Sequence, residues 1–173
     1  MVCHDVKTNR RRVEKSVSAK EMMAMGDDGV YTTGRTIHGN HVVEFDLHAR
    51  RIIDPYPDYK MTEEDVESII RHAFRELNND EDEKRFTLFR NEDRVLRCHA
   101  ERLPPRPSPP IVTAIRGKPR ENPDVKSTNW IQKRSSLESE DVHEVLLADE
   151  QGQLFEGSQT NVFVVEQGGV IRT

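Results

Sequence analysis

A proline-rich run near the middle of the chain restricts its fold more than any other feature. Residues 103–110 read Leu-Pro-Pro-Arg-Pro-Ser-Pro-Pro. Because proline fixes φ and lacks a backbone N–H, this run excludes a helix or a central strand. We therefore predict a proline-rich linker and connecting strand at 103–123, which separates a small domain at 29–102 from the start of a second domain at 124–173. Residues 1–28 form a polar segment without a readable pattern.

The residues before the proline run have the patterns of a small α/β domain. β-branched residues at 29–37, a Gly-Asn turn and a second β-rich stretch at 41–45 predict a hairpin. Residues 62–77 are predicted to form an amphipathic helix, because a threonine stands at the N-cap and apolar residues recur at helical spacing. Two more strands are predicted at 85–89 and 95–100, so the helix would cover a sheet.

Beyond the proline run the pattern changes to short strands. Residues 126–137 are predicted to be helical. Strands are predicted at 144–148, 153–155, 161–165 and 170–173, with glycine-containing turns between them. The predicted fold class is therefore mixed α/β (α+β), with a small two-layer α/β domain followed by the first part of a strand-rich domain.

Composition excludes several classes of function. The 173 residues carry a net charge of −5, and the one basic cluster, at 10–12, is not the basic face of a nucleic-acid-binding protein. No apolar run reaches the roughly 20 residues of a membrane helix, and the N-terminus lacks the apolar stretch of a signal peptide. The two cysteines and seven histidines show no metal-ligand spacing. We expect a cytoplasmic protein without nucleic-acid, membrane or metal partners.

Short sequence motifs occur on both sides of the proline run. Residues 144–165 contain E-x-L-L-x-D, a glycine turn and E-G-x-x-x-N-x-F, and Lys-Ser-Thr-Asn-Trp precedes them at 126–130. Further upstream stand Gly-Val-Tyr-Thr-Thr at 29–33 and His-Ala-Arg-Arg-Ile at 48–52. Together they resemble the fold-type IV (class IV) pyridoxal-phosphate-dependent aminotransferases, a family that includes branched-chain and D-amino-acid aminotransferases and aminodeoxychorismate lyase. The resemblance implies that the second domain is a pseudo-barrel whose pattern continues past Thr173, so we expect its later part to be missing.

The resemblance assigns roles to three charged residues. Lys126 matches the lysine that forms an imine with the cofactor and then moves a proton at the substrate α-carbon. Glu156 matches the carboxylate that pairs with the pyridine nitrogen, and Arg51 matches the arginine that binds the phosphate. Arg50 is an alternative to Arg51 by one residue. Taken alone, Lys126 would be read as an exposed lysine before a helix, as most lysines are, and Glu156 could be a surface glutamate of a hairpin.

Five further residues complete the site that the resemblance implies. Ser158, Gln159 and Thr160 follow the glutamate in a tight turn beside the cofactor. Trp130 stands where relatives often carry a cofactor-contacting tyrosine, and its indole can donate one hydrogen bond. Tyr31 matches an aromatic residue of the substrate pocket. A tryptophan in the core and a tyrosine packed on a strand are the structural alternatives.

The implied function is transfer of an amino group between an amino acid and a 2-oxo acid through a Schiff base on Lys126, in a homodimer. A lyase of the aminodeoxychorismate type uses the same cofactor and lysine, and that alternative stays open. So does a catalytically degenerate family fragment, which the missing region and Trp130 favour. A third alternative is a proline-motif binding protein, because 104–110 contains two P-x-x-P repeats typical of polyproline II ligands.

Overall fold

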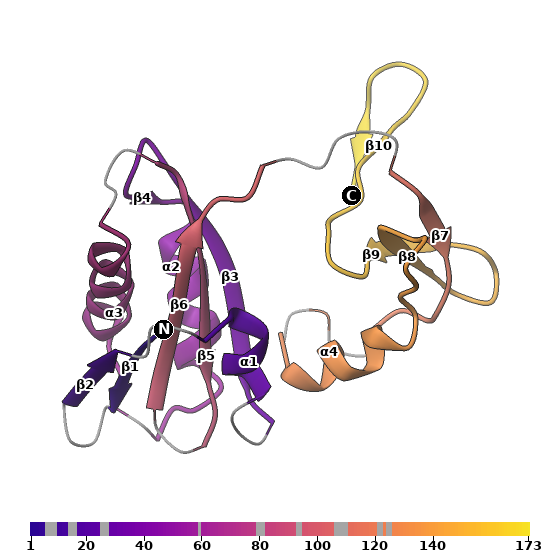
Figure 1. Cartoon of the computed structure of the whole chain (residues 1–173). Coiled ribbons are helices and arrows are strands. Elements are labelled where there is room, and N and C mark those ends of the chain that lie inside the picture. The colour runs from indigo at the N-terminus through magenta and orange to yellow at the C-terminus, as the bar shows by residue number, and fades with distance from the viewer. Residues whose placement is uncertain are drawn as a thin grey trace. The chain divides into compact units, whose positions relative to one another are not determined.

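The computed structural model divides the chain into two compact units (Figure 1). The first unit is Met1–Pro105 with Val125–Asn129, and the second is Arg106–Asp124 with Trp130–Thr173. The described residues are 1–5, 10–13, 17–24, 28–58, 60–78, 82–92, 95–105, 111–120, 123 and 126–173. Residues 106–110 of the proline run lie outside them, so the P-x-x-P ligand and the predicted domain boundaries stay predictions.

The first unit is built on a six-stranded antiparallel sheet. The strand order is β2-β1-β6-β5-β3-β4. The strands are β1 (Val2–Asp5), β2 (Arg10–Val13), β3 (Val30–Ile37), β4 (His41–Val42), β5 (Lys84–Arg90) and β6 (Val95–Arg102). The strands predicted at 29–37, 85–89 and 95–100 are confirmed. β1 and β2 lie where the sequence had no readable pattern, because β1 pairs with the distant β6 and β2 pairs with β1.

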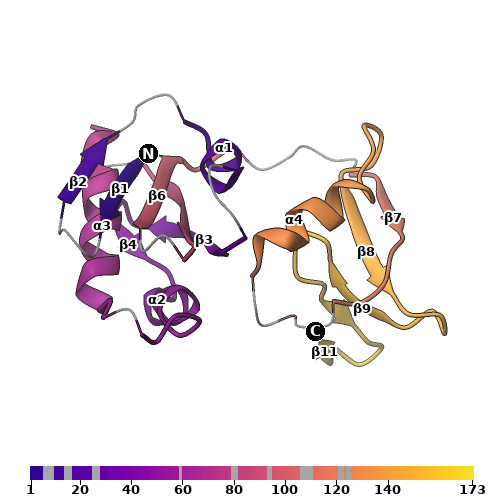
Figure 2. The same ribbon diagram turned by 90° about the horizontal axis from the view of Figure 1, so that it is seen from below.

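Helices α2 (Phe45–Ile53) and α3 (Glu63–Glu76) pack on the sheet and against each other (Figure 2). The predicted cap of α3 is present, since the Thr62 hydroxyl accepts from the Asp65 N–H at 3.3 Å and the Asp65 carboxylate accepts from the Thr62 N–H at 3.0 Å. Its apolar stripe, which includes Ile69 and Phe74, packs into the core of the unit. A third helix, α1 (Ala19–Ala24), buries Met22.

The return strand predicted at 41–45 is shorter than expected. β4 ends at Val42, and Glu44 has the left-handed φ of 52° that turns the chain into α2. Phe45 then packs against the core from the first turn of that helix. The predicted hairpin is therefore confirmed, but the predicted end of its second strand, at residue 45, is wrong. The apolar Phe45 fits a strand and the first turn of a helix equally well, so the sequence alone could not distinguish them.

The second unit is mostly short strands. Helix α4 spans Thr128–Ser135, with its last six residues in this unit. A three-stranded sheet has the order β7-β8-β9, with β7 parallel and β9 antiparallel to β8, and a separate hairpin joins β10 to β11. The strands are β7 (Thr113–Ile115), β8 (Glu144–Ala148), β9 (Leu154–Gly157), β10 (Val164–Val165) and β11 (Ile171–Arg172). The predicted mixed α/β fold class is confirmed.

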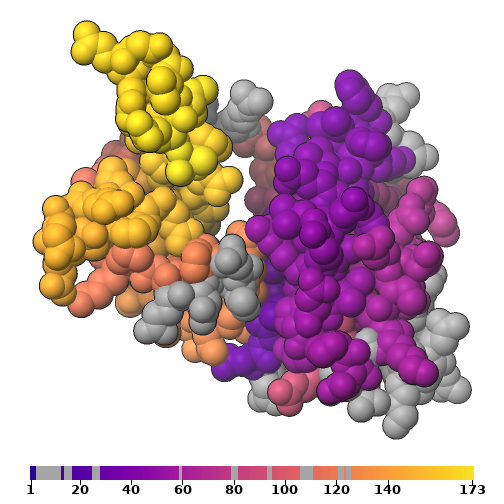
Figure 3. All heavy atoms as spheres, turned by 180° about the vertical axis from the view of Figure 1, so that it is seen from behind, coloured from indigo at the N-terminus to yellow at the C-terminus, as the bar shows by residue number. Residues whose placement is uncertain are grey.

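The surface of the second unit carries many apolar side chains. Figure 3 shows its C-terminal hairpin, in yellow, at the surface, where Val165 and Ile171 are 67% and 65% exposed. Within the described ranges, no helix has the length and apolar character needed to cross a membrane.

Candidate active site

Lys126 lies in a short extended segment that is hydrogen-bonded to the beginning of β3. Its carbonyl accepts from the Tyr31 N–H at 2.8 Å. Two residues on, the Thr128 N–H donates to the Gly29 carbonyl at 2.9 Å, and the Thr128 hydroxyl accepts from the Gly29 N–H at 2.9 Å. The helix predicted at 126–137 therefore begins two residues later, as α4, because the backbone at Lys126 is bonded to a strand. Lys126 is half-buried there.

Gly29 permits this close contact because it has no side chain. A Cβ at this position would lie 2.4 Å from the Arg90 carbonyl oxygen and 2.7 Å from the Phe89 ring. Any side chain at Gly29 would displace the start of β3, and with it the segment that carries Lys126. Tyr31, predicted to line the substrate pocket, is half-buried and contacts this segment through its backbone N–H.

His48 on α2 is a buried, neutral side chain close to two cationic candidates. Its Nδ1 lies 2.7 Å from the Thr32 hydroxyl, and its ring meets the Phe86 ring edge-on with centroids 5.3 Å apart. Burial is the main cause that lowers the pKa of His48 to about 4, and the positive charges of Arg51 and Lys126 lower it further. At neutral pH the His48 ring therefore carries no charge.

Arg50 and Arg51 have different surroundings on α2. Arg50 is exposed, and its Nε donates to the Asp46 carbonyl on the same helix at 3.4 Å. Arg51 is half-buried and acts electrostatically on His48. Sequence reasoning did not single out His48, although its place in the H-x-x-R motif was a usable signal.

In the second unit, Glu156 forms a bidentate ion pair with Arg120. The guanidinium Nε and Nη2 donate to the two carboxylate oxygens at 2.8 and 2.6 Å, and the side chains are only 13% (Arg120) and 24% (Glu156) exposed. The Arg120 guanidinium also lies 5.6 Å from the Trp130 ring centroid, within cation–π range. The Trp130 N–H donates to the Ser158 carbonyl at 3.2 Å. Sequence reasoning missed Arg120, which lies in an irregular loop.

The turn after Glu156 is held by Glu144. One carboxylate oxygen of Glu144 accepts from the Ser158 hydroxyl at 2.8 Å and the Gln159 N–H at 3.3 Å, and the other accepts from the Thr160 hydroxyl at 2.7 Å. Burial alone would raise the pKa of Glu144, but these hydrogen bonds outweigh it, so that the pKa is lowered. The hydroxyl protons of Ser158 and Thr160 therefore point to Glu144.

Comparison with known proteins identifies the family. A model of the amino-transferase class IV family matches residues 29–173. The chain belongs to the class IV aminotransferases. This membership confirms the predicted family, and pyridoxal phosphate is the cofactor of that family. The comparison with curated proteins found no match.

Solved structures of other class IV aminotransferases and lyases have the same fold. A Thermotoga maritima protein, provisionally assigned as a branched-chain amino acid aminotransferase, has a TM-score of 0.67 at 19% identity, with 96% of this chain and 64% of that chain covered. An aminotransferase from Brucella abortus bound to the cofactor PLP has a TM-score of 0.64 at 16% identity, covering 98% and 69%. A Legionella pneumophila protein, provisionally assigned as a 4-amino-4-deoxychorismate lyase, has a TM-score of 0.57 at 14% identity, covering 92% and 66%. This chain thus spans about two thirds of their length.

The donor groups of this class IV aminotransferase chain fit pyridoxal phosphate. In the first unit Lys126 offers an amine and Arg51 a guanidinium, the two group types that an aldehyde and a phosphate require. In the second unit Glu156 offers a carboxylate that is already ion-paired. The predicted roles of these residues stay predictions.

Proposed function

We propose that this chain catalyses transfer of an amino group between an amino acid and a 2-oxo acid, with pyridoxal phosphate bound to Lys126. The observation that carries the proposal is the hydrogen-bonded position of Lys126 beside β3, in one unit with Arg51 and an uncharged His48. These main-chain hydrogen bonds hold the Lys126 segment against the G-V-Y-T-T strand, so two of the family motifs lie side by side.

Lys126 would act through its Nζ. Pyridoxal phosphate supplies an aldehyde that captures amines and a ring that accepts electrons from the substrate α-carbon. The Lys126 amine would hold the cofactor, then take a proton from the substrate α-carbon and return it. That role requires a neutral amine, because only the unprotonated nitrogen can accept the proton.

Arg51 would bind the phosphate with charge-assisted hydrogen bonds from its planar guanidinium. His48 would stay uncharged beside the phosphate contact, because its pKa is lowered. Its ring fills space and is hydrogen-bonded to Thr32, but it adds no positive charge. The Thr32–His48 pair therefore leaves the phosphate contact to Arg51.

Glu156 would pair with the ring nitrogen of the cofactor, and Arg120 would fix the direction of its carboxylate. Because the hydroxyl protons of Ser158 and Thr160 point to Glu144, these side chains would offer a ligand lone pairs rather than protons. The N–H of Trp130 is already bonded to a carbonyl, so we assign its ring a supporting role next to Arg120.

The substrate class and assembly belong to the same proposal. A Mycobacterium tuberculosis protein, a hypothetical aminotransferase with a TM-score of 0.62 at 14% identity, was solved with alpha-ketoglutarate and PMP bound. We propose a 2-oxo acid as the amino acceptor here too.

The exposed apolar side chains of the second unit support the predicted homodimer. The buried free thiol of Cys98 suits the predicted cytoplasmic location.

The test is a visible absorption spectrum of the chain mixed with pyridoxal phosphate, followed by borohydride reduction and mass spectrometry of the modified peptide. We expect a cofactor band that reduction fixes covalently to Lys126 and that Lys126→Ala removes. Lys133→Ala is the matched control, since Lys133 is an exposed lysine of α4. Attachment to other lysines alone, or no band in a folded sample, would refute the proposal.

Turnover then separates the two reactions that share this lysine. A transaminase converts the bound cofactor to its amine form when an amino acid is added and back when a 2-oxo acid is added. A lyase releases product without that change of cofactor. Cofactor attachment to Lys126 with neither reaction would favour the catalytically degenerate alternative.

A further inference from the structure

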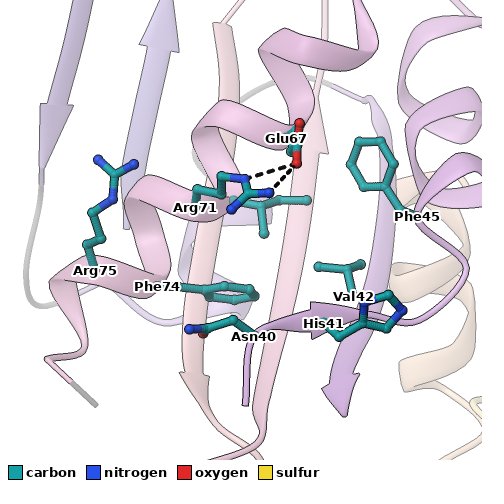
Figure 4. Close-up of a pocket in the computed structure, with 9 residues that line it drawn as sticks. Asn40, His41, Val42, Phe45, Glu67, Arg71, Phe74 and Arg75 are labelled. Carbon is teal, nitrogen blue, oxygen red and sulfur yellow. Dashed lines mark hydrogen bonds and ion pairs between the residues drawn. The ribbon is translucent and has the colours of Figure 1, made fainter. Parts of the chain in front are cut away.

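A pocket of about 560 Å³ lies on the helical side of the first unit, between α3, the β3–β4 turn and the first turn of α2 (Figure 4). None of its described lining residues belongs to the predicted cofactor site. Small-molecule sites in proteins have volumes of roughly 300–1,000 Å³ and an apolar lining with a few polar groups. The volume of this α3–β4 pocket is therefore that of a ligand site.

The floor of the pocket is apolar. Ile70 and Phe74 come from the buried stripe of α3 and are 1% and 4% exposed. Val42 on β4 and Phe45 on α2 are half-buried and stand opposite α3 in Figure 4. An aromatic ring or a branched aliphatic group could pack on both walls.

The α3 side of the pocket is cationic. Arg71 is held by Glu67, with its Nε and Nη2 donating at 2.9 and 2.6 Å to the same carboxylate oxygen. Arg75 stands one turn further along α3, and within the described residues its guanidinium has no hydrogen bond or ion pair. Behind the floor, the buried Lys84 Nζ lies 5.7 Å from the Phe74 ring centroid. The described lining of the pocket therefore carries two guanidinium groups and one carboxylate.

We propose that the α3–β4 pocket binds a small organic carboxylate with an apolar body. The body would pack on Ile70 and Phe74, and the carboxylate would accept charge-assisted hydrogen bonds from Arg75. Charge complementarity selects the anion, because Glu67 already neutralises Arg71 and leaves Arg75 to the ligand. The proposal does not depend on the reaction at Lys126.

The test is a methyl-NMR titration of the full chain with 4-phenylbutyrate as the probe. We expect saturable shifts of the Ile70 and Val42 methyl signals. 4-Phenylbutan-1-ol has the same apolar body without the charge and should bind about tenfold more weakly, as should 4-phenylbutyrate to Arg75→Gln. The matched control is Lys20→Gln, which removes one charge from an exposed residue of α1 and should leave affinity unchanged.

Three results would overturn the proposal. One is equal affinity of the two probes, and another is unchanged affinity in Arg75→Gln with a wild-type circular dichroism spectrum. The third is Ile70 methyl shifts that depend on protein concentration without any probe, since these would show that a second copy of the chain fills the pocket.

Discussion

The two units are stabilised in different ways. In the first, large apolar side chains such as Phe86, Leu88 and Leu96 are fully buried between the sheet and its helices. In the second, Leu147 is fully buried, but Phe163 and Ile115 are each 64% exposed. Polar interactions stabilise the second unit locally. They are the hydrogen bonds of Glu144 to the turn after Glu156 and the Arg120–Glu156 ion pair. An apolar core gives the first unit stability of its own, whereas the second leaves apolar surface for further contacts.

The largest effect should come from a core truncation in the first unit. Phe86→Ala removes a fully buried ring that contacts His48 and Phe74, and it should lower the free energy of unfolding by about 3–5 kcal/mol. The matched change in the second unit, Phe163→Ala, should cost less than about 0.5 kcal/mol, because that ring is largely exposed already. Urea unfolding followed by circular dichroism measures both, and similar losses in the two variants would show that the two units are stabilised in the same way.

Acid should weaken the first unit through His48. The pKa of His48 is about 4 in the folded chain and 6.5 as an ordinary value, so the unfolded state binds more protons between these limits. The contribution of neutral His48 to the free energy of unfolding is therefore fully present above about pH 6.5. It falls as the pH drops toward 4, by a loss on the order of 3 kcal/mol. Urea unfolding at several pH values, followed through the Ile70 methyl signal, measures this loss.

His48→Gln tests the assignment, because glutamine keeps a hydrogen-bonding group near Thr32 without titrating in this range. The variant should lose most of the pH dependence and keep the part from His99, whose pKa is also lowered, chiefly by burial. His41→Gln is the control, since His41 is exposed. An unchanged pH profile in His48→Gln would show that other groups cause the loss.

Features with a local signal could be predicted from the sequence, and features made by distant contacts could not. The α3 helix was predictable because Thr62 and Asp65 form its cap and the apolar stripe lies within one segment. The start of α4 also had a local signal, since the Ser127 hydroxyl accepts from the Asn129 N–H at 3.3 Å like an N-cap.

The candidate site shows the same division. Lys126, Glu156 and the turn after it follow from linear motifs. Arg120 lies 36 residues before Glu156, in a loop without periodicity, and only the folded second unit brings the two together. Likewise, no local pattern shows that Gly29 must lack a side chain, because the atoms that would clash come from the neighbouring strand β5 and the residue after it.

A smaller effect should come from replacing the carboxylate that holds the turn of the second unit. Glu144→Gln keeps the size of the side chain but leaves one amide NH2 where an oxygen now accepts the proton of a hydroxyl. We expect a loss of about 1 kcal/mol, because Glu144 is partly exposed and solvent screens its charge. Trp130 is the only tryptophan and bonds to Ser158, so its fluorescence reports this unit during unfolding.

The pH dependence of the same variant decides what Glu144 contributes. The folded pKa of Glu144 is lowered, so its contribution is present above the ordinary value of 4.5 and is lost as the pH falls through the folded pKa. In wild type the Trp130 transition should therefore move to lower urea as the pH drops below about 4.5, and in Glu144→Gln it should move less. Equal shifts in both proteins would mean that the carboxylate charge does not hold the turn. The second unit would then be stabilised by buried apolar side chains, as the first unit is. The two units would differ only in how many such side chains they have.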